Sequence, residues 1–215
     1  MKLPAKTKKR TEYRQKPWFT GTLCAGCLLL FLNLGTAPDT MVYNRAAIAQ
    51  GELWRLLTGH FVHCDFSHLA WNLMPLLLIA GLLEQRLGAR VTAGVTLVSC
   101  LGVSIWLWFT QTDLPLYCGL SGMLYGLLAV LLATLRQESR HPAIPLIGMA
   151  ALLKIIFEIA SRQAVFTHLS WAGLPGAHGA GMAAGIIYLG MVAASGKGCC
   201  GNQQHNRQGQ TRLIF

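Results

Sequence analysis

Six apolar segments, each long enough or nearly long enough to cross a bilayer, divide this chain of 215 residues. They cover residues 18–34, 66–83, 91–109, 120–135, 143–160 and 177–194. A spanning helix needs about 20 residues, so the fourth segment is short. Charged residues make up 12% of the chain, about half the usual share, which is too few to cover a water-facing surface. The pattern predicts an all-α membrane protein, a bundle of six transmembrane helices.

The distribution of positive charge predicts the orientation. Of the 18 Lys and Arg, 14 lie before residue 17, in the turns 84–90 and 136–141, or after residue 194. Cytosolic loops are enriched in Lys and Arg, so both termini are expected in the cytosol. We expect a basic cytosolic tail at 1–17, a membrane domain at 18–195 and a polar cytosolic tail at 196–215, with no further soluble domain or seventh span. The net charge of +10 therefore does not indicate nucleic-acid binding.

Four polar residues interrupt the apolar segments at matching positions. His68 and Asn72 lie at the start of the second segment, Ser121 opens the fourth and His178 opens the sixth. In the predicted orientation these three helices are parallel, so the four side chains are expected in one layer near the outer face. Polar residues are costly inside a membrane and mark function by default.

Paired glycines predict that the fourth and sixth helices pack closely. Gly122 and Gly126 follow the serine, and Gly181 and Gly185 follow the histidine. Small residues spaced four apart let two helix backbones approach each other. Such an approach would bring the serine hydroxyl within hydrogen-bonding reach of the imidazole.

These residue types suit acyl transfer. Ser121 is the expected nucleophile and His178 its base, because a serine hydroxyl attacks only when a neighbouring base takes its proton. His68, Asn72 and the backbone N–H of Ser121 are the expected oxyanion donors. Tyr125, one turn below the serine, could hold the imidazole by stacking. No acidic residue is expected in this layer, so the site would be a Ser–His dyad and not a triad.

Other histidines are less well placed. His168 and His60 compete with His178 and His68, but no glycine pair follows His168. His63 is expected to fix the loop between the first two segments through hydrogen bonds. That loop, residues 36–65, is long and carries an amphipathic stretch, which predicts a functional loop, a loop lying in the membrane interface, or both.

Lys154 and Glu158 stand four residues apart in the fifth segment. This spacing favours an ion pair on one helix face. The pair could be structural, or it could form a gate or a substrate contact. Among seven cysteines, Cys64 and Cys118 could face an oxidising compartment and pair, and none has strong zinc spacing with a histidine.

Together these motifs resemble the rhomboid family of intramembrane serine proteases. The resemblance is carried by Gly119-Leu120-Ser121-Gly122, by the helix from Ala177-His178 to Gly185, and by the run from His63 to Asn72. Trp54-Arg55 is similar to the family's first-loop motif, and residues 84–88 match its turn after the second helix. The resemblance implies a six-helix bundle with a membrane-interface first loop, membrane-anchored protein substrates, an outward-facing site, and no metal or cofactor.

Residues 51–63 are similar to the rhombosortase subgroup, bacterial enzymes that process proteins with a C-terminal Gly-Gly anchor. This similarity implies a location in the bacterial inner membrane. A general rhomboid protease and a non-catalytic rhomboid-like binder are the alternatives, but retention of Ser121 and His178 argues against the binder. A transporter is disfavoured because the chain has no internal repeat.

Overall fold

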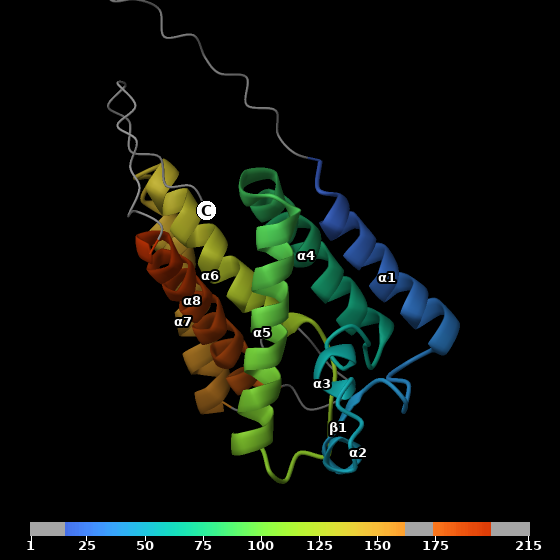
Figure 1. Cartoon of the computed structure of the whole chain (residues 1–215). Helices are drawn as coiled ribbons and strands as arrows, with labels where there is room; N and C mark the ends of the chain where they lie inside the picture. The colour runs from blue at the N-terminus through green and yellow to red at the C-terminus, as the bar shows by residue number, and fades with distance from the viewer. Residues whose placement is uncertain (1–15, 162–173, 199–215) are drawn as a thin grey trace, which may run out of the picture.

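The computed structural model describes residues 16–161 and 174–198, with side chains up to residue 195 (Figure 1). Most of the predicted basic tail at 1–17 and of the polar tail at 196–215 therefore lies outside the described residues. So does His168, the competitor of His178 for the role of base.

Each of the six predicted segments is a helix, which confirms the all-α prediction. The helices are α1 (Trp18–Leu34), α4 (Phe66–Leu87), α5 (Ala89–Thr110), α6 (Ser121–Glu138), α7 (Ala143–Ser161) and α8 (Pro175–Gly198). Within the described residues, α4, α5, α7 and α8 are long and apolar enough to span a membrane, while α1 is a shorter apolar helix. The count of six spans stays a prediction.

Two short helices and a pair of short strands lie at one end of the bundle. They are α2 (Arg45–Ala49), α3 (Arg55–Thr58), β1 (Tyr43–Asn44) and β2 (Leu116–Tyr117). The strands pair antiparallel, with Tyr43 opposite Tyr117. Figure 1 shows this group at the end where α4 and α6 begin, away from the end where the chain enters α1.

The opposite end of the bundle is held by a carboxylate. Glu84, in the last turn of α4, accepts hydrogen bonds from the backbone N–H of Phe19 at 2.9 Å and of Thr20 at 2.8 Å. It also accepts one from the Thr20 hydroxyl at 2.7 Å. The first N–H groups of a helix lack partners within the helix, and a negative charge there is favourable. Glu84 thus fastens the start of α1 to the end of α4.

The paired glycines predicted from the sequence face one another across α6 and α8. A Cβ atom added to Gly181 would lie 1.8 Å from the carbonyl oxygen of Gly122. One added to Gly185 would lie 2.4 Å from the carbonyl oxygen of Gly126. Any larger residue would force the helices apart, so these glycines fix how closely the start of α6 approaches the start of α8.

Candidate active site

Ser121 is the first residue of α6 and follows a strained turn. Gly119 has a φ of +108°, a conformation that favours glycine. Its N–H donates to the carbonyl of Gly59 at 3.0 Å, and its carbonyl accepts from the Tyr117 hydroxyl at 3.2 Å. The turn is therefore fixed from the first loop and from β2, and the half-buried Ser121 stands directly above it.

His68 and Asn72 press against this turn from α4. A Cβ atom on residue 119 would lie 2.6 Å from Nε2 of His68 and 3.5 Å from Nδ2 of Asn72. Only glycine fits here. Asn72 is 3% exposed, and its Nδ2 has no hydrogen-bond partner among the described residues. A buried donor without a partner is costly, which is a cost that functional sites tolerate.

Two thiols stand behind His68. The sulfur of Cys64 lies 3.2 Å from Nδ1 of His68. The ligand atoms of Cys64, His68 and Cys118 all lie within 4.8 Å of one another, so these residues could hold a soft metal ion. A hydrogen bond with Cys64 and burial raise the pKa of the Cys118 thiol, which disfavours the thiolate that a metal needs. The two cysteines are not joined by a disulfide in this structure.

His178 lies in the first turn of α8, between α6 and α7. Its ring stacks on Tyr125 with centroids 4.7 Å apart and an interplanar angle of 23°. Its Nδ1 lies 3.2 Å from Oε2 of Glu158. Lys154 Nζ donates to the other oxygen of Glu158 at 2.6 Å, so the predicted ion pair is present.

The expectation that no acidic residue shares the layer of His178 is wrong. Helix α7 packs against both α6 and α8. It runs in the direction opposite to theirs, so its last turns lie beside their first turns. Glu158, near the end of α7, therefore reaches the depth of His178. Spacing along the chain gave no sign of this, because 20 residues separate the two.

Ser121 and His178 come from helices that touch at Gly122 and Gly181. Within residues 16–161 and 174–198, no direct hydrogen bond joins their side chains. Tyr117, which the sequence did not single out, is the additional polar neighbour of Ser121. Burial raises the pKa of the Tyr117 hydroxyl, an effect that the Ser121 side chain opposes.

Two further histidines of the first loop are buried and neutral. His60 Nε2 lies 3.0 Å from the Ser104 hydroxyl, and burial lowers the pKa of His60 to about 4. His63 packs edge-on against His68 with centroids 5.1 Å apart, and burial lowers its pKa to about 3. His63 holds the first loop through its backbone, because its carbonyl accepts from the Ala37 N–H at 2.8 Å, while neither ring nitrogen has a partner among the described residues.

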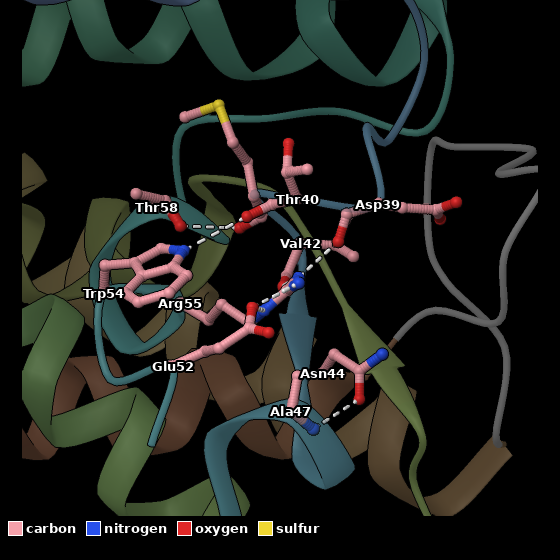
Figure 2. Close-up of polar contacts among 10 residues, drawn as sticks. Asp39, Thr40, Val42, Asn44, Ala47, Glu52, Trp54, Arg55 and Thr58 are labelled. Atoms are coloured by element: carbon pink, nitrogen blue, oxygen red, sulfur yellow. Dashed lines mark hydrogen bonds and ion pairs between the residues drawn. The ribbon is translucent and has the colours of Figure 1, made fainter. Parts of the chain in front are cut away.

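Trp54 and Arg55 organise the first loop (Figure 2). The indole N–H of Trp54 donates to the carbonyl of Thr40 at 3.2 Å. The guanidinium of Arg55 is ion-paired with Glu52 at 2.7 Å and donates to the carbonyls of Asp39 and Val42. The planar fork of arginine suits several oxygen partners at once. These two residues hold the loop and do not contact Ser121.

Comparison with known proteins gives the family. Residues 50–195 match the Rhomboid domain. The rhomboid YdcA of Bacillus subtilis is 33% identical over 129 residues, which cover 55% of this chain and 63% of that protein. Rhomboid protease GlpG of Enterobacter is 30% identical over 125 residues, covering 56% and 44%. Rhomboid protease GluP of Bacillus subtilis is 29% identical over 201 residues, covering 89% and 39%.

The chain spans less than two thirds of the length of each of these relatives. The domain match nevertheless covers more than half of this chain and contains the whole layer described above. Helices long and apolar enough to cross a bilayer accompany it. The chain is therefore an integral membrane protein and belongs to the rhomboid family.

Proposed function

We propose that this protein is an intramembrane serine endopeptidase, with Ser121 as nucleophile and His178 as general base. The observation that carries the proposal is a convergence. The turn before Ser121 is packed against two polar side chains of α4, and the glycine contacts of α6 and α8 bring a stacked imidazole to its other side. Two of the relatives are named rhomboid proteases.

The reaction runs in two acyl-transfer steps. As Oγ of Ser121 bonds to the scissile carbonyl carbon, its proton passes to the imidazole of His178. The tetrahedral intermediate then collapses, the C–N bond breaks, and the leaving amine takes that proton. Water repeats the sequence on the ester and releases Ser121. Tyr125 keeps the ring plane fixed throughout, because stacking restricts its rotation.

The oxyanion is stabilised from α4 and from the Ser121 backbone N–H. The unpartnered Nδ2 of Asn72 is a donor available without breaking another hydrogen bond. His68 supplies a second donor when the Cys64 thiol donates to Nδ1, since the ring proton then lies on Nε2 beside Gly119. Preorganised donors of this kind cost no rearrangement during the reaction.

The substrates are membrane-anchored proteins cut near the outer, periplasmic face of the inner membrane, with both termini of the enzyme in the cytosol. The distribution of Lys and Arg supports this orientation. Glu84 supports it too, because it holds the start of α1 to the end of α4, opposite the end that carries Ser121. A single-pass segment rich in small residues, and so easily unwound, fits a site at that depth.

We further propose membership of the rhombosortase subgroup, with anchors of the Gly-Gly type as substrates. The support is the likeness of residues 51–63 to that subgroup. The alternative is a general rhomboid protease acting on other single-pass proteins. Comparing the secreted and membrane proteomes with and without this gene distinguishes these two functions. The subgroup assignment requires that proteins with Gly-Gly anchors change their distribution between the two fractions.

A fluorophosphonate probe tests the proposal. The purified protein in detergent should be labelled, and Ser121→Ala should abolish labelling because the acylated oxygen is gone. Ser195→Ala is a matched control, since Ser195 lies in the last turns of α8 and its hydroxyl donates to the Met191 carbonyl at 2.9 Å. Labelling that survives Ser121→Ala would reject this nucleophile. An unlabelled wild-type protein would favour a non-catalytic binder.

A further inference from the structure

The carboxylate of Glu158 is the least expected feature beside the proposed base. Four side chains from three helices form what we call the His178 cluster: Tyr125 of α6, Lys154 and Glu158 of α7, and His178 of α8. Glu158 is 1% exposed, and its two oxygens have different partners. Oε1 accepts from Lys154 Nζ at 2.6 Å, and Oε2 lies 3.2 Å from Nδ1 of His178.

Most described side chains of α7 are not buried, so the burial of Glu158 marks the face of this helix that meets the bundle. Of its described residues, only Ile155 and Glu158 are buried. Its large apolar side chains, such as Leu153 and Phe157, are more than half exposed. In a membrane helix, charged residues face the bundle interior and not the lipid, so burial alone does not identify the partner of Glu158; the contact of its second oxygen with His178 does. The carboxylate is on the one face of α7 that reaches His178.

Lys154 offsets the cost of burying the Glu158 carboxylate. Its ammonium balances the charge of Glu158, and it also lies 5.9 Å from the Tyr125 ring centroid. This geometry leaves one oxygen of Glu158 for His178, because the ammonium occupies the other. A carboxylate accepts hydrogen bonds only, so the proton of a neutral His178 must sit on Nδ1. Nε2 then keeps the lone pair that a base needs.

We propose that Glu158 is the positioning residue for His178, so that the site works as a Ser–His–Glu arrangement with Lys154 as the counter-ion of the acid. This inference rests on the proposed function. Glu158 selects the tautomer of His178, holds the ring against Tyr125 and stabilises the imidazolium that forms when Ser121 attacks. The acid comes from a helix next to the histidine, across the bundle from α4.

The test compares Glu158→Gln with Glu158→Ala, because the proposal predicts that the more conservative substitution causes the larger loss of activity. In Glu158→Gln, the amide oxygen takes the place beside Lys154, which can only donate, and the amide NH₂ faces Nδ1. Nδ1 must then accept, the ring proton moves to Nε2, and the base is blocked. In Glu158→Ala, His178 can still adopt the active tautomer. The conservative change should therefore be the more damaging one.

The expected rates of fluorophosphonate labelling follow. Glu158→Gln should be slower than Glu158→Ala by about tenfold or more, with wrong-tautomer losses reaching roughly 10⁴-fold relative to wild type. The loss should lie in the maximal rate at saturating probe. Lys154→Met with Glu158→Gln should recover to at least the Glu158→Ala rate, because the amide can then turn its oxygen toward Nδ1.

Controls separate this inference from folding and from the proposed function. Glu138→Gln removes the acid of a surface ion pair, Arg86–Glu138 at 3.1 Å, and should label at the wild-type rate. Melting temperatures should not rank Glu158→Gln below Glu158→Ala. If Ser121→Ala abolishes labelling but Glu158→Gln is as fast as Glu158→Ala, or the double variant is not rescued, the positioning role is refuted while the nucleophile stands.

Discussion

The two histidines of the site sit in opposite kinds of surroundings. The ring nitrogens of His68 face a thiol and a backbone turn, with the Cys64 sulfur 3.2 Å from Nδ1 and Gly119 against Nε2, while the Asp65 carboxylate accepts from its backbone N–H at 2.6 Å. His178 is enclosed by a carboxylate and an aromatic ring, with Glu158 at 3.2 Å and Tyr125 stacked at 4.7 Å. Both residues lie in the first turn of a helix, so their position in the helix does not explain the difference between their surroundings.

This difference suits the two roles that we propose. An oxyanion donor must keep its proton on the nitrogen that faces the substrate, and a thiol that donates to the other nitrogen holds it there. A general base must accept a proton and carry a positive charge briefly, and a nearby carboxylate stabilises that charge. The same residue type can therefore serve as donor or base according to the element packed behind it.

The largest expected effect distinguishes the proposed base from a proposed oxyanion donor. His178→Ala should reduce turnover of a slow substrate by about 10⁴-fold or more, because the variant lacks the proposed base that takes the serine proton. Asn72→Ala, on the His68 side, should reduce it by roughly 10²–10³, the usual value of one oxyanion donor. Initial rates in detergent measure both. Equal losses would contradict the assignment of base and donor.

Two glycines with positive φ test how closely His68 packs against the turn before Ser121. Gly119 and Gly51 both have positive φ, at +108° and +101°, but only Gly119 has His68 where a Cβ would go. Gly51→Ala should cost about 1 kcal/mol of unfolding free energy from backbone strain and leave labelling unchanged. Gly119→Ala should cost a further 1–3 kcal/mol, because His68 must also shift.

Labelling should also fall in Gly119→Ala alone, by roughly 10²-fold, because a displaced His68 no longer presents Nε2 to the oxyanion. Thermal melting and probe kinetics measured on the same samples check both effects. Equal melting temperatures for the two variants would mean that His68 is not packed as described.

The smallest expected effect concerns His63, which packs on His68 without using its ring nitrogens. The pKa of His63 is about 3 in the folded protein and about 6.5 when unfolded. Between these values the unfolded chain binds the proton and the folded one does not, so stability falls as the pH drops from 6.5 toward 3. This penalty reaches roughly 2 kcal/mol at pH 5.

His63→Phe should keep the ring contact and remove that penalty. Its melting temperature should match or exceed the wild-type value at pH 7.5 and should fall less between pH 7.5 and 5. Some fall remains, because the pKa of His60 is about 4 and this residue titrates in the same direction. A variant that is less stable at pH 7.5 and equally sensitive to acid would mean that the ring nitrogens of His63 have partners.

Much of this protein was predictable from the sequence. Apolar length predicted where helices lie, because a membrane leaves a backbone few alternatives to the helix. The start of α1 was predicted at Trp18 and that of α4 at Phe66, as observed. The period of the helix predicted that Tyr125 lies below Ser121, and glycines four apart predicted the contact of α6 with α8, since these are local properties of one helix.

Only the tertiary structure decided which groups stand behind each histidine. Glu158 meets His178 because the end of α7 lies beside the start of α8, and a contact between antiparallel helices leaves no fixed spacing in the chain. Cys64 reaches the site from the first loop, which Arg55 and its carbonyl partners hold, and Tyr117 reaches it from β2, which pairs with β1. The sequence determined which residues we propose as nucleophile and base, through local periodicity. The fold determined their surroundings, because those depend on which helices pack together.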